Sequence, residues 1–226
     1  MTLVVACMVG LFMFIVSNSD RWSLPVAEEM QPLPAGVSED QRAGAMLEKL
    51  ETKGRAPKTG YARTQFGNGW LKVGGCDTRN TILARDLQEV QINQLCQVVS
   101  GRLTDPYTGE AVQFVRGATT SQSVQIDHVV ALSNAWQTGA QGLTEARRIE
   151  LANDPLNLVA VKGSANQTKS DGDAATWLPP NRAFRCQYIA RQIAVKFKYQ
   201  LWVVPAEKDA MSRILNSCPN QLVPGL

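Results

Sequence analysis

The chain has 226 residues, of which 44% are hydrophobic and 19% are charged. This length and composition suit one sizeable globular domain with a short appendage and exclude a disordered chain. The formal net charge of +3 is only mildly basic, so the total charge does not by itself establish an anionic partner.

An uncharged apolar run over residues 3–16 opens the chain. It is shorter than the roughly 20 residues that a membrane-spanning helix needs, and it suits the core of a signal peptide. Basic residues before it and a clear cleavage site after it are both missing, so a retained membrane anchor stays open. We predict a signal peptide or N-terminal anchor over 1–16, a polar, proline-bearing linker over 17–37, and one folded domain over 38–226. The protein is then secreted or anchored on the outer face of the cytoplasmic membrane.

Hydrophobic periodicity predicts a mixture of helices and short strands in the rest of the chain. A capping-box pattern at Ser38-Glu39-Asp40-Gln41 precedes the first helix, which Gly54 stops. Further helices are predicted over 81–87, 130–138 and 144–153, from 163, from about 174, after Pro179-Pro180, and from Pro205. Strands are predicted from β-branched and apolar content over 96–103, 111–116, 123–127 and 156–161. The fold class is therefore α+β.

Residues 55–75 combine glycines with Tyr61, Arg63, Phe66 and Trp70. Aromatic rings interleaved with cations can stack on bases and bind phosphates. More often such rings fix an irregular loop to the core, and we predict that role for Phe66 and Trp70.

The segment 182–198 is basic and has no acidic residue; its cations are Arg182, Arg185, Arg191, Lys196 and Lys198. Such a face can neutralise phosphates, although a solvated basic helix explains it equally well. The helical spacing predicts a buried stripe made of Cys186, Ile189, Ala190, Ile193, Ala194 and Phe197.

Five cysteines are present, one of them in the first apolar run. The other four, Cys76, Cys96, Cys186 and Cys218, allow three pairings. None forms a Cys-x-x-Cys pair, which disfavours a thiolate zinc site and favours disulfides in an oxidising compartment. We predict the pair Cys76–Cys96, which flanks one helix-and-strand segment, and the pair Cys186–Cys218, which joins the last two helices.

One set of polar residues falls in a pattern typical of catalysis. Asp127 and His128, the only histidine of the chain, end a β-patterned run. Asn157 begins the next strand, Asn166 lies nine residues later, and Lys169 lies three beyond it. This order resembles the HNH endonucleases, which belong to the His-Me finger, or ββα-metal, nucleases.

A looser likeness extends over about 37–218. The segments Cys76-Asp77-Thr78-Arg79-Asn80 and Trp177-Leu178-Pro179-Pro180-Asn181-Arg182 resemble a secreted bacterial branch of the HNH family. That branch is related to the C-terminal nuclease domain of modification-dependent restriction enzymes.

The resemblance implies a ββα-metal core embedded in a mainly helical single domain that disulfides stabilise. Asp127 and Asn166 would ligate one divalent ion, Mg²⁺ with Mn²⁺ as the alternative, because hard ions prefer oxygen ligands. His128 would be the general base, and Asn157 would hold the histidine and its loop by hydrogen bonds. Lys169 and Arg79 would bind substrate phosphate.

The non-catalytic alternatives are that His128 is a structural residue, that Asn157 satisfies backbone groups, and that Lys169 is solvated. Asp171 and Asp173 most simply cap the helix expected from 174. Two departures from the compact family pattern are visible. The gap of 29 residues between His128 and Asn157 requires an insertion of two helices, and the zinc-binding cysteine pairs of many HNH proteins are missing.

The predicted function is metal-dependent hydrolysis of phosphodiester bonds in DNA, and activity on RNA stays open. Little sequence preference is expected, because no recognition module such as a helix-turn-helix is visible. The alternative is a non-catalytic nucleic-acid-binding or cell-envelope protein that retains the nuclease fold. A hydrolase triad is disfavoured, since no Gly-x-Ser-x-Gly elbow accompanies Asp127-His128. No obligate protein partner is implied.

Overall fold

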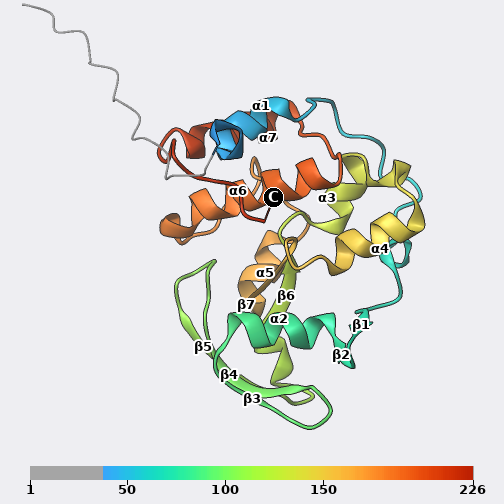
Figure 1. The fold of residues 1–226 in the computed structure, drawn as a ribbon, viewed down its shortest axis with the longest axis vertical. Coiled ribbons are helices and arrows are strands. Elements are labelled where there is room, and N and C mark those ends of the chain that lie inside the picture. Colours follow the sequence, from blue (N-terminus) through green and yellow to red (C-terminus); the bar gives the residue numbers. More distant parts are fainter. Residues whose placement is uncertain (1–37, 226) are drawn as a thin grey trace, which may run out of the picture. The chain divides into compact units, whose positions relative to one another are not determined.

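The structure is a computed structural model that describes residues 38–225 (Figure 1). The predicted signal peptide or anchor over 1–16 and the linker over 17–37 lie outside these residues. Between residues 38 and 225, none of the helices has the length and apolar character needed to cross a membrane.

Helices and strands alternate along the described chain, which confirms the α+β class. The helices are α1 (Ala43–Lys49), α2 (Thr78–Asp86), α3 (Leu132–Gln137), α4 (Glu145–Asn153), α5 (Gly163–Lys169), α6 (Arg185–Lys198) and α7 (Pro205–Leu215). The strands are β1 (Lys72–Val73), β2 (Cys76–Asp77), β3 (Gln88–Ile92), β4 (Val98–Thr104), β5 (Ala111–Val115), β6 (Val124–His128) and β7 (Leu158–Lys162). Short 3-10 turns are η1 (Glu39–Gln41), η2 (Arg63–Phe66), η3 (Ser121–Ser123), η4 (Ala140–Gly142) and η5 (Arg182–Phe184).

The strands pair into small antiparallel sheets, β1–β2, β3–β4–β5 and β6–β7. The β6–β7 pair runs in unbroken register from Val124 opposite Lys162 to His128 opposite Leu158. Helix α2 contacts β4, β6 and β7 and lies beside the β6–β7 pair in Figure 1. Its Ile82 and Leu83 share one apolar core with side chains from both larger sheets. Burial of that core holds β6 and β7 in place.

Helices α1, α6 and α7 form the other main part of the core. Within α6, Phe197 is 42% exposed, so its predicted place in the buried stripe is wrong. The reason is that two apolar clusters flank this helix. Ile189 and Ile193 enter one cluster and Val195 enters the other, which turns Phe197 outward.

The cations of 182–198 mostly bind groups of the same chain rather than forming one free face. Arg191 donates to three backbone carbonyls between residues 155 and 158. Lys196 is buried and pairs with Glu207 at 2.9 Å, and Lys198 pairs with Asp154 at 2.6 Å. These cations therefore stabilise the fold, which neither reading of the basic run anticipated.

Several local predictions need correction. Strand β3 was not predicted, and no helix forms near 174, where Asp173 instead caps a turn by accepting from the amides of Ala175 and Thr176. Gln41 does reach back to the Ser38 amide at 3.1 Å. This box caps only η1, because Arg42 is extended before α1 begins.

Both predicted disulfides are confirmed. Cys76–Cys96 joins β2 to the turn between β3 and β4, and Cys186–Cys218 joins the start of α6 to the chain after α7.

Candidate active site

Strands β6 and β7 and helix α5 position the predicted site residues. Strand β6 ends with Asp127 and His128, and α5 follows β7 without a linker. The junction requires Gly163, since a Cβ there would lie 2.1 Å from the carbonyl oxygen of Gln122. Glycine thus lets the turn before β6 pack directly on the start of α5.

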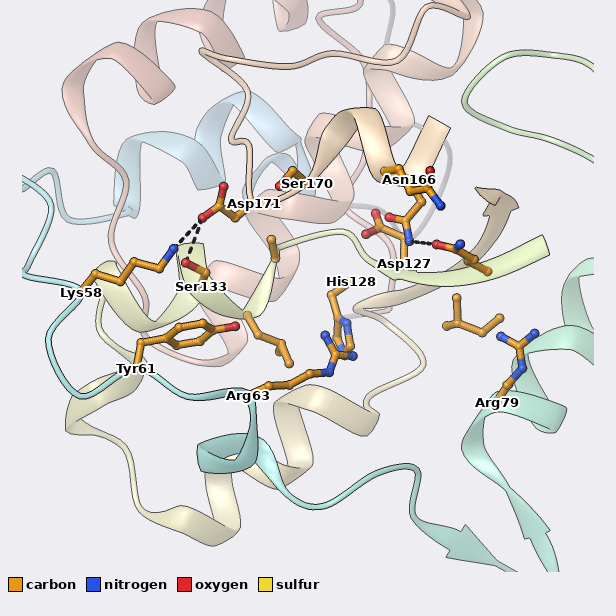
Figure 2. Close-up of a pocket in the computed structure, with 15 residues that line it drawn as sticks. Lys58, Tyr61, Arg63, Arg79, Asp127, His128, Ser133, Asn166, Ser170 and Asp171 are labelled. Carbon is orange, nitrogen blue, oxygen red and sulfur yellow. Dashed lines mark hydrogen bonds and ion pairs between the residues drawn. The ribbon is translucent and has the colours of Figure 1, made fainter. Parts of the chain in front are cut away.

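A hollow of about 670 Å³ opens over the end of β6 (Figure 2). Of the predicted residues, Asp127, His128, Asn166 and Arg79 line it. Asn157 and Lys169 do not line this hollow. Further lining residues come from the segment before β1 and from the chain around α3 and after α5, namely Lys58, Tyr61, Arg63, Ser133, Ser170 and Asp171.

His128 is 6% exposed, and its Nε2 lies 2.9 Å from the carbonyl oxygen of Ala152. Because a carbonyl only accepts, Nε2 carries the hydrogen and Nδ1 is the proton acceptor of the neutral ring. Burial lowers the pKa of His128 to about 3, and the charges of Arg63 and Lys169 add to that effect against the Ala152 contact. The imidazole is therefore neutral at pH 7.

Trp70 stacks on the imidazole, with ring centroids 5.8 Å apart and planes 11° from parallel. We expected Trp70 only to fix the loop to the core, and its contact with His128 was not visible in the sequence. Phe66 fulfils its predicted role, since it is buried beside Trp136. The loop before β1 therefore orients the histidine as well as packing on the core.

Asp127 lies at the centre of a buried polar group. The Tyr107 hydroxyl donates to its Oδ2 at 2.5 Å, and the Lys169 ammonium lies 3.0 Å from Oδ2 and 3.1 Å from Oδ1. Burial raises the pKa of Asp127, while Lys169 and Tyr107 oppose that rise. Tyr107 was missed because it belongs to a sequence recognisable only as a turn.

The surroundings of Lys169 differ from those expected of a residue that binds substrate phosphate, the role predicted for it. Its side chain is fully buried, and its ammonium also donates to the carbonyl oxygen of His128 at 2.9 Å. The ammonium thus binds the end of β6, and its charge balances that of Asp127.

Asn157 is fully buried between the two ends of the insertion. Its Oδ1 accepts from the Val130 amide at 2.8 Å, and its Nδ2 donates to the carbonyls of Val130 and Leu151 at 3.3 and 3.4 Å. These bonds hold the chain after His128 against the end of α4, which also carries the Ala152 carbonyl. This is the geometry of the role that we predicted for Asn157, whose effect on activity stays a prediction.

Asn166 donates from Nδ2 to Oε1 of Gln125 at 2.9 Å. That bond leaves its Oδ1 as an acceptor on the same hollow as Asp127 (Figure 2). A carboxylate has about four lone-pair positions, and the carboxylate of Asp127 interacts with the Tyr107 hydroxyl, the Lys169 ammonium and the His128 backbone amide. Two oxygen ligands with room for waters suit a hard divalent ion. No group of three or more His, Cys, Asp or Glu residues that could hold a metal is found between residues 38 and 225.

Arg79 lines the other end of the hollow and donates to the Val124 carbonyl at 3.0 Å. Burial, and then the charge of Arg116, lowers its pKa. On the opposite side, Lys58 pairs with Asp171 at 3.1 Å. Lys58 and Arg79 thus border the hollow from opposite sides (Figure 2), and Asp171 offsets the charge of Lys58.

Residues 77–214, more than half of the chain, match the family model for GmrSD restriction endonucleases, C-terminal domain. A protein of Arthroderma benhamiae, described as an uncharacterized secreted protein, is 38% identical over 190 residues, which are 83% of this chain and 90% of that protein. No solved structure matches the chain. The chain therefore belongs to the family of the GmrSD restriction endonuclease C-terminal domain, which is a nuclease family.

Proposed function

We propose that this protein is an exported HNH-type endonuclease that hydrolyses phosphodiester bonds of DNA with the help of one divalent ion. In this proposal β6, β7 and α5 are the ββα-metal core. The observation that carries it is the setting of His128. A neutral imidazole, fixed at Nε2 by the Ala152 carbonyl, leaves Nδ1 as the proton acceptor of a residue that lines the same hollow as Asp127 and Asn166.

The proposed reaction begins with His128, whose Nδ1 accepts a proton from the attacking water. Asp127 and Asn166 would hold the ion, Mg²⁺ first and Mn²⁺ as the alternative. When bound, such an ion neutralises charge on the phosphate and supports the leaving 3′ oxygen. Tyr107 and Lys169 fix the Asp127 carboxylate by hydrogen bonds. Lys169 thus has a positioning role, and Arg79 stays the proposed phosphate contact at the far end.

The proposed metal dependence is tested by plasmid nicking with Mg²⁺, Mn²⁺ or EDTA. Asp127 supplies a single negative charge, and Lys169 lies 3.0 Å from it, so the ion should bind weakly and depend on substrate phosphate. We expect nicking with Mg²⁺ or Mn²⁺ and none in EDTA. Full activity in chelator would refute the single-ion mechanism.

The role of His128 is tested by His128→Ala. Removing the base should lower the cleavage rate by about 10²–10⁴-fold, the usual contribution of a positioned general base. DNA affinity should change little, because the other contacts remain. The melting temperature of the same sample is the control for folding. A folded variant that cuts at the wild-type rate ends the HNH proposal, and wild-type protein that binds DNA without cutting it favours the non-catalytic alternative.

Export is supported by the apolar run over residues 3–16 and by the similarity to the Arthroderma benhamiae protein, which is described as secreted. Expression of the full chain, followed by sequencing of the mature N-terminus, tests it. A processed protein in the medium is the expected result. Retention in the membrane fraction with an intact N-terminus would favour the anchor, and retention in the cytoplasm would contradict export.

A further inference from the structure

Arg63 differs from the other cations of the hollow. Lys58 is paired with Asp171, and Arg79 donates to backbone carbonyls. Arg63 is exposed and lines the hollow, yet it has no hydrogen-bond or ion-pair partner among residues 38–225. An unpaired guanidinium with all its donors available is suited to bind an anion that is not part of the chain.

The backbone below Arg63 is held firmly. It opens η2, whose last residue, Phe66, is buried. Arg148 donates to the Gln65 carbonyl at 2.8 Å and to its side chain at 3.2 Å, which fixes the turn to α4. The Arg63 side chain therefore extends from a backbone that is fixed in position.

The guanidinium lies next to the proposed base. Arg63 and His128 line both the main hollow and a smaller cavity of about 140 Å³ beside it. In Figure 2 the Arg63 side chain extends from η2 toward His128, and Asp127 and Asn166 lie beyond His128 in the same view. An anion over His128 would thus have the guanidinium on one side and the proposed ion ligands on the other.

The geometry points to Arg63 as the residue that binds the scissile phosphate. This inference rests on the proposed function and deepens it. A guanidinium can hold two non-bridging phosphate oxygens at once, which fixes the phosphate in position over His128. Its charge then stabilises the negative charge that develops during attack. Lys169, the lysine expected from the sequence to do this, is fully engaged with Asp127 and His128.

Two variants and one control test the inference on the full chain. Arg63→Ala removes the contact, and Arg63→Lys keeps the charge but loses the two-pronged geometry. Arg213→Ala is the matched control, since Arg213 is an exposed arginine of α7 that does not line the hollow. The substrates are duplex DNA and bis(4-nitrophenyl) phosphate, a diester that has no flanking phosphates.

We expect Arg63→Ala to lower kcat/KM for both substrates by about 10²–10³-fold, as removal of one preorganised transition-state donor does. Arg63→Lys should recover part of the loss, and Arg213→Ala should match wild type. Wild-type rates for Arg63→Ala would overturn the inference. A loss confined to DNA would also overturn it, because Arg63 would then contact a flanking phosphate.

DNA affinity in EDTA separates this inference from the proposed function. Arg63→Ala should bind DNA more weakly, and its salt dependence should decrease by about one counterion. If Arg63→Ala binds DNA more weakly but the wild-type protein never cleaves DNA, the nuclease proposal is refuted and the phosphate contact still holds. Unchanged affinity and salt dependence in Arg63→Ala would overturn the contact itself.

Discussion

The ammonium of Lys169 lies in the protein interior, within hydrogen-bond distance of Asp127 and of the His128 carbonyl. Removing one partner of a buried ion pair leaves an uncompensated charge, which costs about 3–5 kcal/mol. We therefore predict that Lys169→Met lowers the free energy of unfolding by about that amount in urea denaturation. Lys49→Met is the control, because Lys49 pairs with Asp40 at the surface, where such pairs contribute about 1 kcal/mol or less. Equal, small losses in both variants would contradict the buried pair.

At the scale of residues, the sequence best predicts the site residues that lie on a strand or on the helix directly after it. Asp127 and His128 are neighbours at the end of β6. Asn166 lies on α5, the helix that follows β7, which pairs with β6. Residues three apart on a helix differ in direction by about 60°, which is enough to place Asn166 on the hollow and Lys169 in the core. Arg63 and Tyr107 reach the site from distant segments, and tertiary packing alone fixes such contacts.

At the scale of elements, the disulfides give a direct test. Each closes a loop, with sequence separations of 20 and 32 residues, and should contribute about 3–4 kcal/mol in the chain-entropy model. We predict that the double variants Cys76→Ser/Cys96→Ser and Cys186→Ser/Cys218→Ser each lose that much in chemical denaturation. Below their melting temperatures the DNA cleavage rate should persist, because none of these cysteines lines the hollow. A reductant that leaves the wild-type melting temperature unchanged would contradict this prediction.

The starts of α4 and α7 agree with local signals in the sequence. Thr144 caps α4 by accepting from the Arg147 amide, and Pro205 begins α7. Strand β3 escaped prediction because it is polar and irregular, with Glu89 at a φ of 55° and a register shift around Gln91. Its pairing with β4, across the short turn that follows it, supplies the order that its own residues do not encode.

At the scale of the whole molecule, Asp154 joins the end of α4 to the end of α6. It accepts from Lys198 at 2.6 Å and from the Tyr199 hydroxyl at 2.7 Å. Burial alone would raise the pKa of Asp154, but these bonds and the Leu156 amide outweigh burial and lower it. A lowered carboxyl pKa stabilises the fold above the unfolded-state pKa, near 4, and this stability is lost as the pH falls through the folded-state value.

We predict that Asp154→Asn lowers the free energy of unfolding at pH 7 by about 1.5–3 kcal/mol, the range for hydrogen bonds to a charged group. The difference from wild type should shrink as the pH is lowered below about 4, because the wild-type carboxylate then gains a proton. Urea denaturation at several pH values measures this. Asp40→Asn is the control, since Asp40 pairs only at the surface. A difference between Asp154→Asn and wild type that does not depend on pH would contradict the assignment.

Lys58 and Arg63 line one side of the hollow and come before residues 77–214 in the sequence, the stretch that matches the family model. Asp127 and His128 lie within that stretch. The proposed base and ion ligands thus lie inside the matched stretch, whereas Arg63, the proposed contact to the scissile phosphate, lies before it. Irregular loops tolerate insertion, deletion and drift better than paired strands do. A change in this loop would therefore alter how the substrate phosphate is held while Asp127, His128 and Asn166 keep their places on β6 and α5. A chimera in which residues 55–75 are exchanged between two homologues would show whether substrate preference travels with the loop.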